Sequence, residues 1–237
     1  MIEKHYQKLS MPQGEILKWY GNTMMIENRN RLVNAVLAKM VSVLDAEGIS
    51  SLLLKGQGCA QFYSSPLHRS PGDIDLYVGD ENFALVKQVL GNAKIVDAWG
   101  HEDVKHASFS CKGVSVELHK KADAIPGGKS NCLCQKAVKA ALNETKSGFT
   151  VDGVFVRTLP LELNVVYVFI HMFRHFVSGG IRLRQVCDWL FICHKISDFD
   201  KVKHYLQNFG FLSVWNDFAR MAIVYLNANS RILLEET

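Results

Sequence analysis

The segment that decides the fold runs from Leu52 to Val78 and reads LLLKGQGCAQFYSSPLHRSPGDIDLYV. It begins with a short apolar run, which predicts a strand over 51–54, and continues through a glycine turn at Lys55–Gly58 into a short helix that ends near Tyr63. A loop then leads to a second predicted strand that carries Asp73-Ile74-Asp75. Because side chains alternate faces along a strand, we expect both carboxylates on one face and the intervening isoleucine in the core.

The charges and glycines of this segment indicate a type of chemistry. Two carboxylates held side by side repel each other, and a cation between them removes that repulsion. Mg²⁺ is commonly bound by one or two carboxylates together with phosphate oxygens of a substrate. A glycine turn that leads into a helix presents free backbone N–H groups and the positive end of the helix dipole, which suit a phosphate. The segment therefore predicts metal-assisted chemistry on a nucleoside triphosphate.

The composition is that of an ordinary globular protein. The chain has 237 residues, 48% hydrophobic and 21% charged, which suits one large domain or a domain with a helical appendage. The net charge of +4 is only mildly basic, and the Lys and Arg residues are scattered, so charge alone does not indicate a nucleic-acid partner. The N-terminus lacks the apolar segment of a signal peptide, and no apolar run approaches the roughly 20 residues that span a bilayer. We therefore expect a cytoplasmic protein with no membrane partner, whose six cysteines are reduced.

Hydrophobic periodicity divides the chain into an α/β centre flanked by helices. Apolar residues at helical spacing predict a helix over 23–47, with Asn22 or Thr23 as its N-cap and Gly48 as its stop. Further helices are expected over 81–90, 129–143, 161–177, 184–196, 199–209 and 211–226. Strands are expected over 94–98, 105–111 and 114–119, with a hairpin around 151–154. The expected division is an N-terminal helical segment (1–47), an α/β core (48–159) and a C-terminal helical region (160–237).

A third carboxylate lies on the strand predicted over 114–119. The apolar residues of this strand alternate with polar ones that include Glu117 and His119, so these two side chains point away from the core. If this face lies beside Asp73 and Asp75, three carboxylates converge in the layout that holds one or two divalent ions at a phosphorus centre. Glu117 then either completes the metal site or accepts a proton from an attacking hydroxyl. The alternative is an ordinary solvent-facing residue, and the nearby Asp-x-Asp favours the functional interpretation.

Two cationic side chains flank the glycine turn and the aspartates. Lys55 and Arg69 are placed to neutralise triphosphate charge, Arg69 by a bidentate fork and Lys55 as a point charge. The alternative for both is an ion pair with the aspartates when no metal is bound.

The helical region contributes polar residues of its own. His171 and His175, four residues apart, share a helix face, and Arg184 and Asp188 follow at the same spacing. Arg184 and Asp188 are expected to form an ion pair if they serve only to orient the helix. If this face lines a cleft, the two histidines and Arg184 contact the triphosphate or the acceptor. Both interpretations remain open.

Several short motifs, taken together and in their order along the chain, can be compared with those of known families. They are Leu54-Lys55-Gly56, Tyr63, Arg69, Gly72-Asp73-Ile74-Asp75-Leu76, Glu117-Leu118-His119, Pro160 with Glu162, His171, His175 and Leu183-Arg184-Gln185-Val186-Cys187-Asp188-Trp189. Together they resemble the uncharacterised bacterial nucleotidyltransferases of the DNA polymerase β-like superfamily. The resemblance implies an α+β fold in which a small mixed sheet is flanked by N-terminal helices and a C-terminal helical region that covers the nucleotide cleft.

The resemblance also implies roles for individual residues. Asp73, Asp75 and Glu117 are then the catalytic and metal-binding residues, and Lys55, Gly56, Gln57, Arg69, His171, His175 and Arg184 are expected to bind the nucleotide. One position departs from the pattern: the wider superfamily has Gly-Ser at the turn, where the serine hydroxyl helps to hold a phosphate, and this chain has Gly56-Gln57. The phosphate must be held differently or more weakly here.

Three functional hypotheses follow. The leading one is a nucleotidyltransferase, dependent on Mg²⁺ or Mn²⁺, that moves a nucleoside monophosphate from a nucleoside triphosphate to an acceptor hydroxyl and releases pyrophosphate. The acceptor is expected to be a small molecule or a protein rather than a nucleic acid. The second hypothesis is a catalytically inactive protein of the same fold that binds a nucleotide or a partner. The third is a metal-dependent phosphohydrolase, which would release phosphate instead of pyrophosphate.

Overall fold

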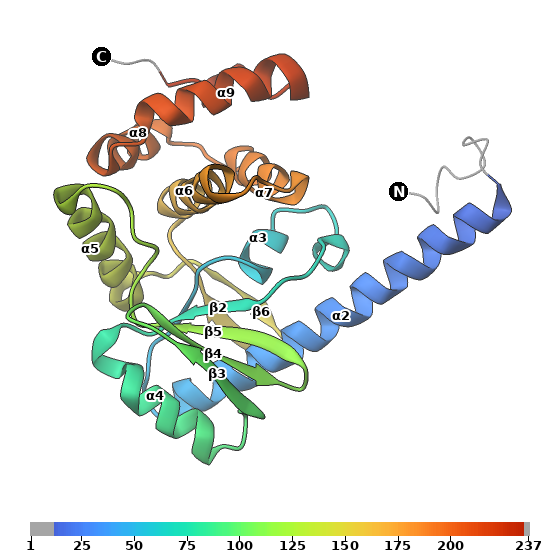
Figure 1. The fold of residues 1–237 in the computed structure, drawn as a ribbon, viewed down its shortest axis with the longest axis vertical. Coiled ribbons are helices and arrows are strands. Elements are labelled where there is room, and N and C mark those ends of the chain that lie inside the picture. Colours follow the sequence, from blue (N-terminus) through green and yellow to red (C-terminus); the bar gives the residue numbers. More distant parts are fainter. Residues whose placement is uncertain (1–11, 235–237) are drawn as a thin grey trace.

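The computed structural model describes residues 12–234 and divides them into a half built around a sheet and a half built from helices (Figure 1). The main sheet contains β1 (Leu52–Leu53), β2 (Ile74–Tyr77), β3 (Ala98–Glu102), β4 (His106–Cys111) and β5 (Val114–His119). The helices are α2 (Gln13–Ala46), α3 (Gln57–Ala60), α4 (Asp80–Asn92), α5 (Gly128–Glu144), α6 (Leu161–Ser178), α7 (Leu183–Cys193), α8 (Phe199–Phe209) and α9 (Leu212–Leu226). Short 3₁₀ turns at Pro66–His68 and Ser230–Ile232 and a hairpin of β6 (Gly148–Val151) and β7 (Val154–Arg157) complete it.

The main sheet is mixed, with the strand order β1-β2-β5-β4-β3. Strands β2 and β5 pair in parallel, and the other neighbours are antiparallel. In the parallel pair Asp75 is in register with Glu117, and Tyr77 is in register with His119. This register places the polar residues of both strands on one face, as the alternation of the sequence predicts.

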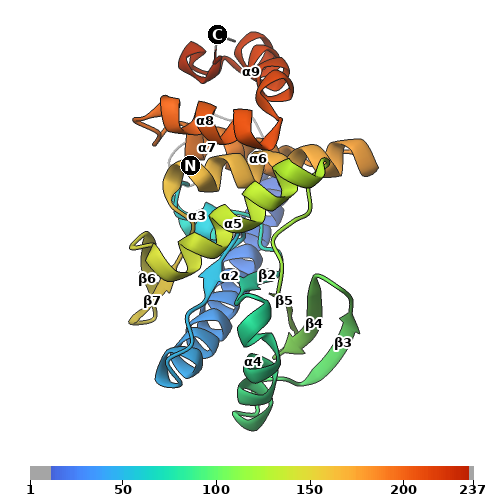
Figure 2. The same cartoon turned by 90° about the vertical axis from the view of Figure 1, so that its left-hand side faces the viewer.

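The two faces of the sheet belong to different cores. Ile74, Leu76 and Val78 pack with α2 and α4 in one hydrophobic cluster, whereas Tyr77, on the opposite face, belongs to a second cluster formed mainly by α5 to α9. Figure 1 shows α2 and α4 below the sheet and α3, α6 and α7 above it, with α8 and α9 outermost. Figure 2 shows the same stack from the side. Asp75 therefore faces the helical half of the molecule.

The long helix α2 begins ten residues before the expected start, at Gln13 instead of Thr23. The expected N-caps, Asn22 and Thr23, are interior helix residues, so that part of the prediction is wrong. The buried residues of α2 lie between Asn30 and Leu44, and the preceding half projects from the body of the protein (Figure 1). A segment whose residues are mostly exposed needs no apolar stripe, so periodicity could not locate the helix start.

The strand predicted over 94–98 is also wrong, because the strand in this region is Ala98–Glu102. All five residues of β3 are exposed at the edge of the sheet, so they show no alternation of apolar and polar side chains. Ile95, which suggested the strand, is buried in the loop that precedes it. The other expected helices, the strands over 105–111 and 114–119 and the hairpin around 151–154 form within a few residues of their predicted bounds.

No helix among residues 12–234 is long and apolar enough to cross a membrane.

Candidate active site

Three carboxylates meet on the face of the sheet that is turned toward the helical half. Asp73 directly precedes β2, Asp75 lies on β2, and Glu117 lies beside it on β5. One oxygen from each carboxylate lies within 4.8 Å of the other two. The predicted convergence of these side chains is therefore confirmed. The carboxylate of Asp75 is buried, that of Glu117 is half-buried, and Asp73 is exposed at the mouth of the site.

Two cations hold the most buried of these carboxylates. The Nζ atom of Lys55 lies 3.0 Å from Oδ1 of Asp75, and Nε2 of His119 lies 3.1 Å from the same oxygen. Burial by itself raises the pKa of Asp75, but Lys55 and His119 outweigh it and hold that pKa well below its usual range. His119 also lies 3.4 Å from Glu117. Burial lowers the pKa of His119, but its hydrogen bonds to the two carboxylates raise it to about 9.

The charge of the cluster is not fully balanced. Burial and the neighbouring charge of Asp75 raise the pKa of Asp73 above its ordinary value. A carboxylate whose charged form is disfavoured by another carboxylate gains from a nearby cation. Carboxylate oxygens are the ligands that Mg²⁺ and Mn²⁺ prefer, so Asp73, Asp75 and Glu117 fit such an ion in both donor type and spacing.

The glycine turn lies against the carboxylates as a tight piece of backbone. Gly56 has a φ of 59°, and a Cβ atom at this position would lie 3.1 Å from the carbonyl oxygen of Asp73. The N–H of Leu54 donates to the carbonyl of Asp75, so the turn and the second strand are bonded to each other. Only a residue without a side chain fits this approach without strain.

Gln57 lies at the turn, but its side chain points away from the cleft. Its amide nitrogen donates to Oδ1 of Asn34 on α2 at 2.6 Å, and the side chain is buried there. The residue that replaces the superfamily's serine therefore anchors the turn to α2. Of Gln57, only the backbone N–H remains available to a phosphate.

The roof of the site is a polar network on α6 and the loop after β5. Nδ1 of His171 lies 3.0 Å from Oδ2 of Asp123 and 3.2 Å from Nζ of Lys55. Burial raises the pKa of Asp123, but His171, Lys55 and Arg174 together hold it well below its usual range. Asp123 is therefore ionised and can only accept hydrogen bonds, and Nδ1 of His171 lies within reach of both this acceptor and the donor Lys55. His175 lies beyond it, with its Nε2 3.1 Å from Nε2 of His171.

A second set of bonds ties α7 to the loop that carries Asp73. Arg69 donates from Nε and Nη2 to the two oxygens of Asp188, each at 2.8 Å, and both side chains are buried. The hydroxyl of Tyr63 donates to Asp188 at 2.7 Å. We call Tyr63, Arg69 and Asp188 the α7 clamp. Because two of its nitrogens are used in this way, Arg69 stabilises the loop in addition to facing the cleft.

Arg184 supports the same loop and, among residues 12–234, has no acidic partner. Its Nη1 donates to the carbonyls of Ser70 and Pro71, each at 3.0 Å. The expected ion pair between Arg184 and Asp188 does not form, since Asp188 bonds to Arg69 and Tyr63 instead. That prediction is wrong.

These elements enclose a cleft of about 790 Å³ between the sheet and the helical half. This volume lies within the range of about 300–1,000 Å³ typical of small-molecule sites. The cleft is lined by Lys55, Gly56, Arg69, Asp73, Asp75, Glu117, His171, His175, Arg182, Arg184 and Asp188, among others. The structure thus brings together every predicted site residue except the side chain of Gln57.

Some residues at the site are not among the predicted site residues, and His119, Asp123 and Asp188 are the ones with the strongest interactions there. His119 shares the polar face of Glu117, and its position in the strand pattern could have indicated its role. Asp123 lies in an irregular loop, and Asp188 lies on a helix whose face could not be assigned from the sequence. No local pattern identifies the last two, because their partners come from distant parts of the chain.

Comparison with known families identifies the type of protein. Residues 1–225 match the model of a protein family described as "Uncharacterised nucleotidyltransferase". A comparison with curated proteins finds no match.

Solved structures share the fold at low sequence identity. The solution structure of the antibiotic-resistance factor ANT(2'')-Ia has a TM-score of 0.54 and 11% identity, and the match covers 82% of this chain and 97% of that one. A crystal structure of ANT(2'')-Ia with adenylyl-2''-tobramycin has a TM-score of 0.52 and 12% identity, covering 77% and 98%. An antigenic nucleotidyltransferase-like protein from Paracoccidioides brasiliensis has a TM-score of 0.53 and 13% identity, covering 83% and 93%. The fold is that of the polymerase β-like nucleotidyltransferases, as expected.

The α7 clamp generates a prediction about stability. Asp188→Asn leaves the buried guanidinium of Arg69 without a charged partner, and loss of one member of a buried ion pair costs about 3–5 kcal/mol. We expect a loss of this size in the free energy of unfolding measured by urea denaturation. Asp217→Asn removes one member of an exposed ion pair with Arg220 and is the matched control, with an expected loss below about 1 kcal/mol. Equal losses in the two variants would contradict a structural role for the clamp.

Proposed function

Because the chain belongs to the uncharacterised nucleotidyltransferase family, we propose that it transfers a nucleoside monophosphate from a nucleoside triphosphate to an acceptor hydroxyl. The observation that carries this proposal is the convergence of Asp73, Asp75 and Glu117 beside the turn at Gly56, within one cleft. Carboxylates for a metal and backbone N–H groups for phosphates are the two parts that phosphoryl-type transfer requires.

Different residues of the chain would have different roles in this reaction. Asp73, Asp75 and Glu117 would hold Mg²⁺ or Mn²⁺, which when bound polarises a phosphate oxygen and lowers the pKa of a hydroxyl. The turn at Gly56 and the side chain of Lys55 would receive the triphosphate. In the transfer, a bond forms between the acceptor oxygen and the α-phosphorus, the bond from that phosphorus to the β-phosphate oxygen breaks, pyrophosphate leaves, and the hydroxyl proton passes to water.

The roof and the mouth of the cleft would complete the binding site. His171, His175, Arg182 and Arg184 line the same cleft as the carboxylates, so we propose that they contact the triphosphate or the acceptor. Arg69 would add positive charge at the triphosphate, although its guanidinium is also paired with Asp188. ANT(2'')-Ia has been solved with adenylyl-2''-tobramycin, and a small-molecule acceptor suits a cleft of this size better than a nucleic acid does.

A second candidate function is nucleotide binding without catalysis. It is favoured by Gln57, whose amide is bonded to Asn34 and offers nothing to a phosphate. The two functions differ in turnover and not in binding.

The proposal predicts a loss of transfer when the metal ligands are changed. Asp73→Asn removes one exposed carboxylate without disturbing the core, and loss of one charge-stabilising group typically lowers the rate by about a hundredfold or more. The assay follows label from [α-³²P]nucleoside triphosphates into acceptors of a cell lysate, together with pyrophosphate release. Asp80→Asn, an exposed carboxylate outside the cleft, is the matched control.

Three results would contradict parts of this scheme. Release of phosphate in place of pyrophosphate would indicate a hydrolase. Magnesium-dependent binding of a nucleotide without any transfer would favour the second candidate. Equal transfer by Asp73→Asn and the wild-type protein would remove the carboxylates from the mechanism.

The glycine turn generates a separate prediction. In Gly56→Val the new side chain would press on the carbonyl of Asp73 and would strain a backbone with positive φ. We expect this variant to lose nucleoside triphosphate binding in isothermal titration calorimetry. Gly113→Val, at a turn with positive φ and open space around it, controls for backbone strain alone. Unchanged affinity in folded Gly56→Val protein would place the phosphates elsewhere.

A further inference from the structure

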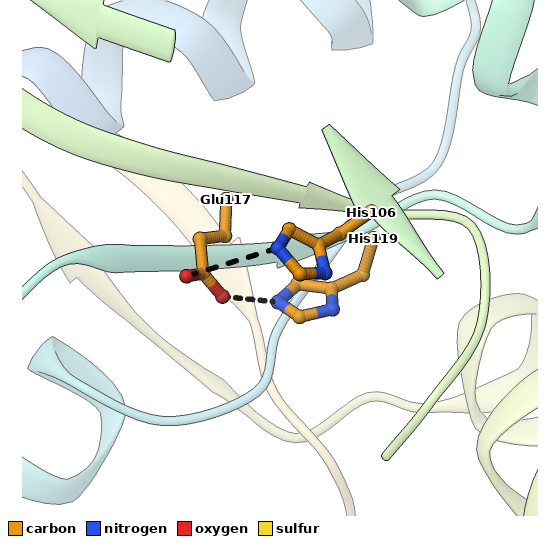
Figure 3. A group of neighbouring side chains, drawn as sticks. All are labelled: His106, Glu117 and His119. Carbon is orange, nitrogen blue, oxygen red and sulfur yellow. Dashed lines mark ion pairs between the residues drawn. The ribbon is translucent and has the colours of Figure 1, made fainter. Parts of the chain in front are cut away.

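We propose that His106, Glu117 and His119 bind a divalent transition-metal ion at a second site, which adjoins the group of three carboxylates and shares Glu117 with it (Figure 3). This site goes beyond the proposed transfer reaction, because two of its three ligands are imidazoles that the reaction does not use.

Strand pairing brings the three side chains together. His106 on β4 lies directly opposite His119 on β5, and Glu117 lies two residues earlier on the same face. Nε2 of His119 lies 3.4 Å from Oε2 of Glu117, and Nε2 of His106 lies 4.0 Å from Oε1. Figure 3 shows both rings beside the carboxylate, with each carboxylate oxygen directed at one ring. One donor atom from each residue lies within 4.8 Å of the other two.

The donor set distinguishes this site from its neighbour. Imidazole nitrogens suit Zn²⁺, Co²⁺, Ni²⁺ and Cu²⁺, whereas Mg²⁺ is bound by oxygen ligands. Asp73, Asp75 and Glu117 offer only oxygen. Two adjacent sites with different ligand types can therefore select different ions from one solution.

A carboxylate lies near the other ring nitrogen of His106, where the group that orients a metal-binding histidine is usually found. Nδ1 of His106 lies 3.5 Å from Oδ1 of Asp103. That oxygen is itself fixed, because it accepts hydrogen bonds from the backbone N–H groups of Lys105 at 2.6 Å and His106 at 2.9 Å. With Nδ1 turned toward Asp103, Nε2 is the nitrogen that faces Glu117. This arrangement is independent evidence that the ring is prepared as a ligand.

Occupancy of this site would alter the neighbouring one. Nε2 of His119 bonds to Asp75 as well as to Glu117, and a metal ion at this nitrogen would take the place of the proton, which leaves to solvent. Asp75 would then lose a hydrogen bond, and Glu117 would be shared between two ions. The geometry thus couples a transition-metal ion to the carboxylates proposed for transfer.

The experiment uses Co²⁺ as the probe, because its visible absorption changes with the coordination number and shifts when nitrogen ligands replace oxygen. The full-length protein is titrated with CoCl₂ in excess MgCl₂, and binding is followed by absorption and by isothermal titration calorimetry. We expect one nitrogen-ligated Co²⁺ per chain, lost in His106→Ala and retained in Asp73→Asn. His101→Ala, an exposed histidine on the neighbouring strand β3, is the matched control and should bind as the wild type does. Asp103→Asn should weaken binding by about tenfold, because it removes the group that orients the ring.

The outcomes separate this inference from the transfer reaction. Loss of the absorption band in His106→Ala with unchanged circular dichroism supports the site whether or not the protein transfers nucleotides. Equal Co²⁺ binding by wild-type and His106→Ala protein would overturn it, as would absence of the band in wild-type protein. Loss of the band in Asp73→Asn as well would show that the histidines and the carboxylates bind Co²⁺ as one site and not as two, and would also overturn it.

Discussion

The parallel pairing of β2 with β5 is the constraint on which the site depends. It sets Asp75 in register with Glu117. Because side chains alternate faces along a strand, this register also determines the face to which each neighbouring side chain points. Ile74, Leu76 and Val78 are committed to the core shared with α2 and α4. A shift of one residue in this register would bury the carboxylates among apolar side chains and expose the core. Packing of these apolar side chains in the core thus fixes the register that places the carboxylates on the opposite face of the sheet.

A buried carboxylate needs positive charge or hydrogen-bond donors nearby, and both halves of the fold supply them. Asp75 has Lys55 from the glycine turn and His119 from β5. Asp123 has His171 and Arg174 from α6. Because Lys55 also lies 3.9 Å from Asp123, a continuous run of opposite charges extends from the sheet to the helical half. The cleft is polar at its centre and is stabilised by the same groups that we propose bind the ligand.

The sequence was sufficient where the pattern is local. Asp73, Asp75 and Glu117 could be assigned to one face because strand alternation is a property of neighbouring residues, and the turn at Gly56 could be recognised from its glycines. It was insufficient where partners are distant: Arg69 and Asp188 are 119 positions apart, and neither shows in advance which charge it meets. The predictions for the edge strand β3 and for the projecting half of α2 failed for a related reason, since exposed residues carry no periodicity. The amide of Gln57 marked a departure from the family pattern, but only the fold reveals that it bonds to α2.

The α7 clamp has a consequence for how a ligand enters. Many cleft enzymes swing two lobes together over the substrate, and hinge residues absorb the motion. Here the sheet half and the helical half are joined across the cleft by the buried ion pair of Arg69 with Asp188 and by the bonds of Arg184 to backbone carbonyls. A wide opening of the cleft would have to break these bonds. These bonds therefore restrain the width of the cleft. The entropy cost of ordering its walls is met during folding rather than each time a ligand binds. Under the proposed function, a cleft of restrained width would select ligands by their shape at the entrance, and changes to the residues of the rim would change that selectivity.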